Sequence, residues 1–413
     1  MTFPRILIVA GSDSGGGAGI QADIKTVTML GAHAMNAITA ITAQNTIGVQ
    51  AVHAIHTEIV VAQMRSCIDD IGVDAIKIGM IGSAETAHAV ADVLEELSPS
   101  PLRGEGAERS DGGRGAERDA AWSTLPLSPA LSPQAGRGRV PIVFDPVMVA
   151  TSGAILADDA TIAAFARLMA LATVVTPNLP ELAALGGEAA VLAHAAALLV
   201  KGGHGEGAVL TDRLLDRSGQ VVRWESPRID TTSTHGTGCT LASAIATNLA
   251  RGLTLPTAIA NARRFVRTAM HDAAGLGAGH GPMAQQAVRL DLGDGPRLNQ
   301  MTLPLQDYGA SVAFYKMLGL RQIVATADGH YARFEAAGGA TLSIGHAERA
   351  SVYLEHEDLD AAVAAAQAAG IGFDEPPQDK PWLWREAWTR DPAGNPVCLY
   401  QAGENRRFPP WRV

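Results

Sequence analysis

Cysteine is scarce in this chain, which has only three in 413 residues: Cys67, Cys239 and Cys398. They are far apart and form no Cys-x-x-Cys pair, so a disulfide framework is not expected and a reducing cytoplasm is the simplest location. The first residues lack a signal-peptide pattern, and no apolar run is long enough to span a bilayer. We therefore expect a cytoplasmic protein with no membrane partner.

The chain also lacks clusters of basic residues. Its formal net charge is −10, and no group of Lys or Arg gathers on a helical pattern. This argues against nucleic acid as the main partner. Hydrophobic residues make up 47% and charged residues 18%, which is typical of a well-buried α/β protein. Because 413 residues exceed what one hydrophobic core accommodates, two domains are expected.

Two common phosphate-binding motifs are missing from the glycine-rich segment Gly11–Asp23, which follows the first predicted strand. No glycine stands three residues after Gly19, so the dinucleotide fingerprint is incomplete, and the GK[ST] of a P-loop is absent. The glycines still let the backbone approach a ligand closely. If buried, Asp23 can accept hydrogen bonds from an amino or hydroxyl group; the alternative is a solvated helix residue.

The chain does contain a second glycine-rich turn, His235–Gly238, which leads into an Ala-rich helical pattern with Cys239 at its start. A helix start binds phosphate-like anions through free N–H groups and a partial positive charge. The same field stabilises a thiolate, so we expect Cys239 to be unusually acidic. An anion cradle beside a potential base suits phosphoryl transfer to a hydroxyl. The alternative is a buried cysteine behind an ordinary glycine turn.

Strand and helix patterns alternate over 1–97 and 140–288, which predicts an α/β domain with a parallel sheet. The segment between them, 98–139, is dominated by Gly, Pro, Ser and Arg without periodicity, so we expect a disordered insertion, with a functional loop as the alternative. The predicted strands are 5–10, 35–42, 75–79, 140–145, 173–176 and 207–211, and the predicted helices are 20–30, 58–71, 189–199 and 256–273.

The pattern changes after an expected linker at 289–300. Residues 301–413 predict an α+β domain in which the order strand, helix, three strands occurs twice. The predicted elements are a strand at 301–305, a helix at 309–318, strands at 330–334, 340–344 and 352–355, a helix at 359–369 and further strands to Tyr400.

Polar residues follow several of the predicted strands of the first domain. Asp145 ends a buried strand, Asn178 and Glu181 follow the next one, and Lys201 follows an apolar run. Open α/β sheets bind ligands at this edge. Carboxylates at adjacent strand ends can hold Mg²⁺ through water, and a lysine there can meet a phosphate. Taken singly, such residues are ordinary turn chemistry.

In serial order, the motifs GSDSGGGAGIQAD, AQNTIGVQ, IKIGMIG, DPVM, TPNLPE, KGGH and GTGCTL resemble the hydroxymethylpyrimidine/phosphomethylpyrimidine kinases of thiamine biosynthesis. The resemblance covers 1–97 and 140–288. It implies a ribokinase-like fold with a mostly parallel sheet flanked by helices, ATP and Mg²⁺ as cofactors, and a homo-oligomer, a dimer formed through the kinase domain. The implied reaction phosphorylates 4-amino-5-hydroxymethyl-2-methylpyrimidine and then its monophosphate. A pyridoxal-type kinase of the same superfamily is the alternative.

The same resemblance implies residue roles. The pyrimidine pocket would be formed by Gly11, Asp23, Gln44 and Met80. The nucleotide and Mg²⁺ side would be formed by Asp145, Asn178, Glu181 and Lys201. The anion hole would be formed by Gly236, Thr237 and Gly238. A carboxamide suits an aminopyrimidine because it donates and accepts together. Cys239 stands where many sugar kinases of the superfamily have an aspartate base, so it would accept the hydroxyl proton or position the hydroxyl.

The C-terminal segments 303–307, 311–319 and 391–395 resemble the vicinal oxygen chelate superfamily, which includes glyoxalase and bleomycin-resistance proteins. The implied metal-ligand positions are Gln300, Ser343, Ser351 and Cys398. Only Gln300 is a ligand of the family's type, so we expect a metal-free, ligand-binding domain. A small-molecule sequestration or resistance protein led by this domain is the alternative function.

Other side chains of this domain are open to two interpretations. Its histidines have spacings that suit no common metal site: His330, His346 and His356. Four of the six tryptophans also lie at this end: Trp382, Trp384, Trp388 and Trp411. Aromatic side chains can stack on a flat ligand or fill a small β core, and the sequence leaves both possibilities open.

Overall fold

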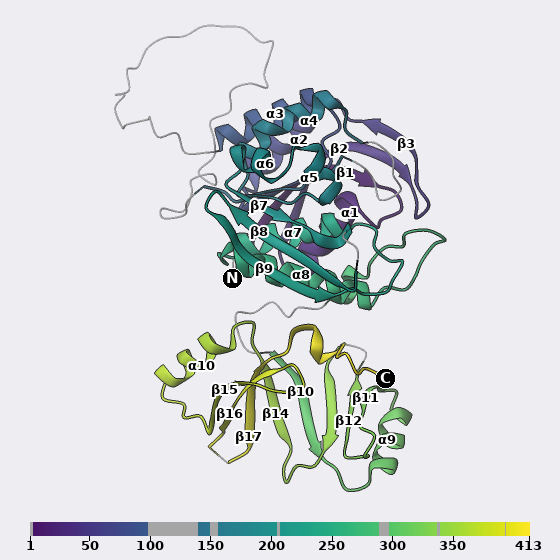
Figure 1. Cartoon of the computed structure of the whole chain (residues 1–413), viewed down its shortest axis with the longest axis vertical. Coiled ribbons are helices and arrows are strands. Elements are labelled where there is room, and N and C mark those ends of the chain that lie inside the picture. Colours follow the sequence, from purple (N-terminus) through teal and green to yellow (C-terminus); the bar gives the residue numbers. More distant parts are fainter. Residues whose placement is uncertain are drawn as a thin grey trace. The chain divides into compact units, whose positions relative to one another are not determined.

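The computed structural model describes residues 3–97, 139–148, 156–204, 207–288, 297–336, 339–392 and 394–413. The insertion expected at 98–139 lies outside the described residues, Arg139 excepted. Contacts between residues divide the chain into two compact units, Met1–Val288 and Arg289–Val413. Each unit has a sheet of its own (Figure 1).

The described residues of the first unit form a nine-stranded sheet in the order β3-β2-β1-β4-β5-β6-β7-β8-β9. Neighbouring strands from β2 to β7 are parallel, and β3, β8 and β9 are antiparallel to their neighbours. The central strands are continuous apolar runs, as expected of a sheet covered on both faces. The bounds are β1 (Arg5–Asp13), β2 (His33–Gln44), β3 (Val49–Ala54), β4 (Ala75–Ile78), β5 (Ile142–Phe144), β6 (Val174–Val175), β7 (Ala197–Val200), β8 (Val209–Asp216) and β9 (Gly219–Pro227).

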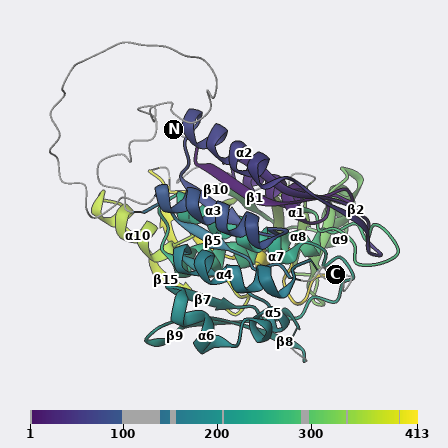
Figure 2. The same cartoon turned by 90° about the horizontal axis from the view of Figure 1, so that it is seen from above.

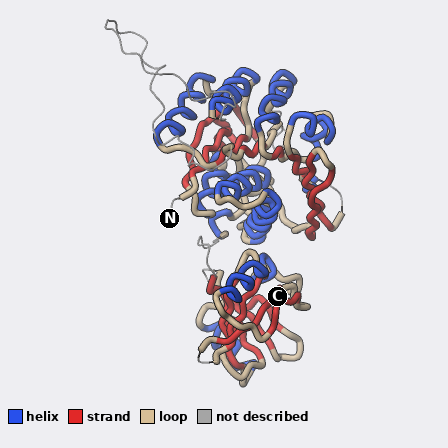
Figure 3. Tube along the Cα trace, turned by 90° about the vertical axis from the view of Figure 1, so that its left-hand side faces the viewer, coloured by secondary structure: helices blue, strands red, loops and turns tan. Residues whose placement is uncertain are grey.

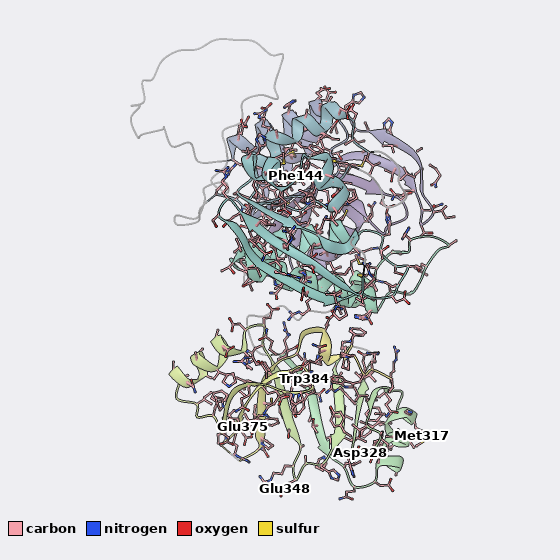
Figure 4. The ribbon with its side chains drawn as sticks, in the orientation of Figure 1. Phe144, Met317, Asp328, Glu348, Glu375 and Trp384 are labelled. Atoms are coloured by element: carbon pink, nitrogen blue, oxygen red, sulfur yellow. The ribbon has the colours of Figure 1, made fainter. Side chains whose placement is uncertain are left out.

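Helices cover both faces of this sheet (Figures 2 and 3). Helices α2, α3, α4 and α6 lie on one face, and α1, α7 and α8 lie on the other. The bounds are α1 (Gly19–Met29), α2 (Thr57–Asp70), α3 (Ala84–Glu96), α4 (Asp159–Leu171), α5 (Leu179–Ala184), α6 (Glu188–His194), α7 (Thr237–Ala250) and α8 (Leu255–His271). In the core, Phe144 (labelled in Figure 4) packs edge-on against Phe165, and their ring centroids are 5.1 Å apart. The predicted α/β fold with a mostly parallel sheet is confirmed.

One predicted helix is wrong in its second half. The pattern over 189–199 predicts a single helix, but α6 ends at His194 and Ala197–Val200 forms strand β7. Ala195, the residue after α6, already has an extended conformation with ψ 152°. A short apolar run satisfies either a buried helix or a buried strand, and pairing with β6 and β8 decides between them.

The described residues of the second unit form an eight-stranded sheet in the order β11-β12-β13-β10-β14-β17-β16-β15. Helices α9 and α10 lie beside opposite ends of this sheet (Figure 1). The bounds are β10 (Arg297–Pro304), α9 (Tyr308–Met317), β11 (Arg321–Ala325), β12 (Tyr331–Glu335), β13 (Thr341–Gly345), β14 (Ser351–Glu355), α10 (Leu359–Ala368), β15 (Glu375–Asp379), β16 (Arg385–Arg390) and β17 (Pro396–Gln401).

The predicted repeat of strand, helix and three strands is present twice, with two corrections. The sequence pattern missed β11, so Ser351–Glu355 opens the second repeat and does not close the first. The first strand begins at Arg297, inside the expected linker 289–300. None of the helices in the described parts of the chain combines the length and hydropathy needed to cross a bilayer.

Candidate functional site

A cavity of about 1300 Å³ opens at the carboxyl edge of the parallel strands in the first unit. Strands β1, β4, β5, β6 and β7 all end at this edge, where open α/β sheets bind ligands. Of the residues expected in the phosphoryl-transfer site, only Asp23 does not line the cavity. The lining includes Gly11, Gln44, Met80, Asp145, Asn178, Glu181, Lys201, Gly236, Thr237, Gly238 and Cys239. The strand order thus brings together motifs that are far apart in the chain.

The glycine-rich turn before Cys239 forms the start of α7. Gly236 is the N-cap residue, with φ 80° and ψ 13°, a left-handed conformation that favours glycine. A Cβ on Gly236 would lie 1.9 Å from the carbonyl oxygen of Gly17, so the loop after β1 packs directly on this turn. The first N–H groups of a helix have no acceptor inside it, and the helix dipole adds partial positive charge. This end of α7 is therefore suited to bind an anion.

A buried ion pair lies beside this turn. Lys201 Nζ is 2.7 Å from Asp145 Oδ1, which also accepts a hydrogen bond from Thr176 Oγ1 at 2.9 Å. A Cβ on Gly238 would lie 3.3 Å from both Asp145 Oδ2 and Lys201 Nζ, so the start of α7 is close to the pair. Burial alone lowers the pKa of Lys201, but the carboxylates of Asp145 and Glu181 raise it above its usual value. A charged ammonium group therefore adds to the positive field of the helix start.

Asn178 and Glu181 form the capping box of α5. The Asn178 side chain accepts a hydrogen bond from the Glu181 backbone N–H at 2.9 Å, and Glu181 Oε2 accepts one from the Asn178 backbone N–H at 2.8 Å. Burial raises the pKa of Glu181 to about 7, Lys201 opposes this shift, and Asp145 adds to it. The Asn178 side-chain oxygen is thus committed to the helix, whereas the charge of Glu181 responds to the neighbouring ion pair.

Cys239 is the third residue of α7, yet its thiol is not acidic. Burial raises the pKa of Cys239 to about 11, with Lys77 opposing the shift and Asp23 adding to it. A hydrogen bond from the backbone of Gly19 also favours the thiolate. The prediction of an unusually acidic thiol is wrong, because burial and the nearby carboxylates raise the pKa of this thiol more than Lys77 and the Gly19 backbone lower it.

Asp23, expected to contact a ligand, lies buried behind the cavity wall. Its fully buried carboxylate accepts hydrogen bonds from Lys77 Nζ at 2.8 Å and Ser243 Oγ at 2.7 Å, which joins α1 to β4 and α7. Lys77 lines the cavity, whereas Asp23 does not. Asp23 is therefore not exposed to the cavity in this structure, and both of its carboxylate oxygens accept hydrogen bonds from neighbouring side chains. A lysine in the otherwise apolar strand β4 was the sequence signal that pointed to this ion pair.

Several polar residues that the sequence analysis did not single out also line the cavity, among them Asp13, Thr42 and His235. His235 Nε2 lies 2.9 Å from Asp13 Oδ2 and 3.2 Å from the Gln44 amide nitrogen. Thr42 Oγ1 lies 3.1 Å from Gln44 Oε1. These contacts join the glycine-rich loop, the end of β2 and the turn before α7. The position of His235 next to Gly236 was the signal available in the sequence.

In the second unit, the four implied metal-ligand positions lie on the neighbouring strands β13, β10, β14 and β17. Gln300 Nε2 donates to Ser343 Oγ at 2.5 Å, and Gln300 Oε1 accepts from Thr341 Oγ1. Cys398 is buried, and burial raises the pKa of its thiol far above the usual range. Within the described ranges, no group of three or more His, Cys, Asp or Glu side chains is placed to hold a metal ion.

The aromatic and histidine side chains of this unit serve different purposes. Trp384 (labelled in Figure 4) is 3% exposed and stacks on Tyr400 with ring centroids 4.7 Å apart, so it fills the core of the unit. Trp382, which is 41% exposed, donates its indole N–H to the buried carboxylate of Glu386. Trp388 donates to the same carboxylate. His330 and His346 contact each other through ring nitrogens 2.9 Å apart.

Two family models match the chain. A model described as phosphomethylpyrimidine kinase matches residues 13–102 and 131–284. A model described as glyoxalase/bleomycin resistance protein/dioxygenase superfamily matches residues 297–399. Both resemblances inferred from the sequence motifs are confirmed by these matches.

The chain is also similar to curated proteins. It is 42% identical to the hydroxymethylpyrimidine/phosphomethylpyrimidine kinase of Streptomyces coelicolor over 68% of this chain and 94% of the relative. It is 42% identical to the protein of the same name from Rhizobium meliloti over 67% of this chain and 95% of the relative. The thiamine biosynthesis bifunctional protein ThiED of Geobacter sulfurreducens is 41% identical over 71% of this chain and 54% of the relative.

Solved structures share the fold of the first unit. The pyridoxal kinase of Bacillus subtilis, solved as an ADP complex, has a TM-score of 0.55 and 29% identity over 70% of this chain and all of that one. The pyridoxal kinase of Staphylococcus aureus, solved with AMP-PCP and pyridoxal, has a TM-score of 0.53 and 25% identity over 69% of this chain and 94% of that one.

Proposed function

The chain belongs to the phosphomethylpyrimidine kinase family, and from this premise we propose that it phosphorylates 4-amino-5-hydroxymethyl-2-methylpyrimidine with ATP and then converts the monophosphate to the diphosphate in thiamine biosynthesis. One observation carries this proposal. A single cavity joins a wall formed by Gly11, Gln44 and Met80 to a positive end formed by Lys201 and the start of α7.

The positive end of the cavity suits the phosphates of ATP. We assign the transferred phosphoryl group to the backbone of Gly236, Thr237 and Gly238, because its equatorial oxygens carry the charge that helix N–H groups stabilise. Lys201, oriented by Asp145, adds a cation on the nucleotide side. In this arrangement the terminal phosphate faces the heterocycle wall, which aligns it with the substrate hydroxyl.

Two carboxylates at this end fit a divalent cation. Asp145 and Glu181 are both buried beside Lys201, and oxygen ligands of this kind are those that Mg²⁺ prefers. We propose that they hold Mg²⁺ through water, with Asn178 positioning Glu181 through the capping box. When bound, Mg²⁺ would neutralise part of the phosphate charge.

Cys239 lies at the junction of the two ends, and we propose that it contacts the substrate hydroxyl. With a thiol pKa of about 11, the neutral form prevails at pH 7. This favours a hydrogen bond that positions the hydroxyl over complete removal of its proton. Loose phosphoryl-transfer transition states need little assistance from a base.

Comparison of three acceptors tests the proposed activity against the pyridoxal kinase alternative, which the two solved kinases keep open. ATP consumption is measured with the hydroxymethyl aminopyrimidine, with its monophosphate and with pyridoxal. We expect kcat/KM to be highest for the two pyrimidines, because the curated relatives that span this unit are named for them. A preference of tenfold or more for pyridoxal would overturn the proposal.

Gly11→Ala should weaken binding of the heterocycle selectively. The new Cβ would lie 3.0 Å from Met80 Sδ and 3.7 Å from the carbonyl oxygen of Ala40, so the methionine, which lines the cavity, must shift. We expect a five- to tenfold rise in KM for the pyrimidine, equivalent to about 1 kcal/mol, with the KM for ATP unchanged.

Steady-state kinetics with each substrate varied in turn measure the effect of Gly11→Ala. Gly372→Ala is the matched control, because no atom lies within 4 Å of its added Cβ and it belongs to the second unit. An equal rise in both KM values would contradict the placement of Gly11 in the pyrimidine wall.

For the second unit we propose a metal-free, ligand-binding domain. The support is chemical: Gln300 has both amide atoms engaged by neighbouring side chains, and serine hydroxyls are poor metal ligands at neutral pH. Metal analysis of the purified full-length chain tests the proposal, which stoichiometric zinc or nickel would overturn. A sequestration protein led by this unit would instead bind a small molecule tightly without turnover of ATP.

We further propose a homodimer formed through the first unit, and a cytoplasmic location. The dimer is supported by the edge of the sheet, where β3 is the outermost strand and Val52 and Ile41 are about half exposed. Light scattering measures the molar mass, and a monomer at micromolar concentration would contradict it. The location is supported by the three cysteines, all free, and fractionation of cells would test it.

A further inference from the structure

The imidazole of His235 lies between two polar groups, one of which needs a hydrogen-bond donor and the other an acceptor. His235 Nε2 is 2.9 Å from the carboxylate oxygen Oδ2 of Asp13 and 3.2 Å from the amide nitrogen of Gln44. The ring is 6% exposed and lines the cavity. One nitrogen cannot donate a proton to a carboxylate and accept one from an amide at the same time. The state of Asp13 decides which contact is a hydrogen bond.

The surroundings of Asp13 stabilise its ionised carboxylate. Its Oδ1 accepts the backbone N–H of Gly15 at 2.8 Å, and its Oδ2 accepts those of Gly17 at 3.0 Å and Ala18 at 2.8 Å. Burial alone raises the pKa of Asp13, but His235 and these backbone donors outweigh it and lower the pKa. A carboxylate only accepts, so His235 Nε2 must carry the proton and donate it to Asp13.

The hydroxyl of Thr42 also constrains the orientation of the Gln44 side-chain amide. Thr42 Oγ1 lies 2.9 Å from the carbonyl oxygen of Ser12 and 3.1 Å from the Gln44 side chain. The Ser12 carbonyl only accepts, so the single hydroxyl proton of Thr42 is used there. Thr42 Oγ1 can then only accept from Gln44, which requires the amide NH₂ on this side.

Both neighbours therefore impose the same orientation on the amide. The NH₂ group must face Thr42, and the carbonyl oxygen must face His235, because a protonated Nε2 has no lone pair to accept an amide N–H. Rotating the amide by half a turn exchanges two atoms of nearly equal size, so the proton count of the neighbours determines the orientation. Each amide atom keeps one hydrogen-bonding position for a ligand: a lone pair on the His235 side and an N–H on the Thr42 side.

We propose that His235, held as the Nε2–H form by Asp13, acts with Thr42 to lock the carboxamide of Gln44 and thereby determines which heterocycle the enzyme accepts. This inference rests on the proposed function. The locked amide accepts from an exocyclic amino group and donates to the adjacent ring nitrogen, which is the pattern of a 4-aminopyrimidine. The 4-oxo analogue presents the reverse pattern, a carbonyl beside a ring N–H, and is rejected.

The kinetic test compares the 4-amino substrate with its 4-oxo analogue in the full-length chain. In the parent chain we expect kcat/KM to favour the amino compound about 10²-fold, because a site with committed hydrogen-bonding groups leaves them unpaired with the wrong ligand. Thr42→Val and His235→Leu each release one end of the amide, so the ratio should fall about tenfold. Equal losses for both compounds, with an unchanged ratio, would show a purely structural role and overturn the inference.

Two further variants and one spectroscopic measurement keep the test decisive. His235→Gln retains an N–H donor and should preserve more of the ratio than His235→Leu. Thr247→Val is the matched control, because it removes a buried hydroxyl that bonds only within α7, to the Ser243 carbonyl at 2.8 Å. This control should leave the ratio of kcat/KM between the amino and oxo compounds unchanged.

Nitrogen NMR of the histidine-labelled chain reports the tautomer directly, with His235→Gln assigning the resonance. We expect a protonated Nε2, and a proton on Nδ1 alone would overturn the inference even if the variants were inactive. Failure of the proposed function is a separate result: the parent chain would not phosphorylate the amino compound, while the NMR measurement would still decide the state of His235.

Discussion

Replacing Cys239 by alanine is expected to lower kcat by about 10²-fold, the cost typical of a misplaced reacting group, while ATP binding survives. The thiol lies at the start of α7 and lines the cavity. Single-turnover kinetics and equilibrium titration with ATP measure the two quantities separately. Near-normal turnover in this variant would remove Cys239 from the mechanism.

Cys239→Ser and a pH profile distinguish the two roles that remain for the thiol. The thiol has a pKa of about 11, so the thiolate fraction increases about tenfold with each unit by which the pH rises toward that value. If the thiolate accepts the substrate proton, kcat rises from pH 7 to 10, and the serine variant is as inactive as alanine. If the neutral thiol positions the hydroxyl, kcat is nearly flat over this range, and serine retains much of the activity.

Lys77→Met is expected to lower the free energy of unfolding of the first unit by about 3–5 kcal/mol, the usual cost of breaking a buried ion pair. Both side chains of the Lys77–Asp23 pair are fully buried, with 2.8 Å between Nζ and Oδ2. Without the ammonium, the Asp23 carboxylate keeps only Ser243 as a side-chain donor. Urea titration, monitored by hydrogen exchange in α1 and β4, measures the unfolding of this unit separately from that of the second unit.

Two controls separate the loss of the ion pair from a general effect of substitution. The double variant Asp23→Asn with Lys77→Met removes both charges together and should recover at least half of the lost stability. Arg65→Met breaks an exposed ion pair with Glu96, so it should cost no more than about 1 kcal/mol. A small effect of Lys77→Met alone would contradict a charged pair at this position.

The kinase fold was predictable because its signals are local. Apolar runs such as Arg5–Ala10 end in glycine or polar residues, and this spacing predicts strands followed by turns and helices. The antiparallel edge strands were harder to predict: β3 and β9 contain only half-buried and exposed residues, so their sequences resemble loops. Each of them pairs with the strand before it in a hairpin, β3 with β2 and β9 with β8, so the missing signal was the apolar alternation that marks a segment as a strand.

The composition of the cavity wall was also largely predictable. The carboxyl ends of parallel strands meet at one edge, so motifs placed after strands had to converge, as Asp145 and Lys201 do. Asp23 is the exception, because it lies one turn into α1 on the face that packs against β4 and α7. Whether a side chain of α1 meets a ligand or is buried depends on which face of the helix it occupies. That face is defined by packing against β4 and α7, which are distant in the chain.

The sequence by itself determined the family, the two-part architecture and the glycine turns, because these depend on residue type and spacing along the chain. Only the tertiary structure decided the protonation of Cys239, the ion pair of Asp23 and the orientation of Gln44. Each of these is an electrostatic property of groups brought together from separate strands and helices. Burial and hydrogen-bonding partners determine such properties, and both exist only once the chain has folded.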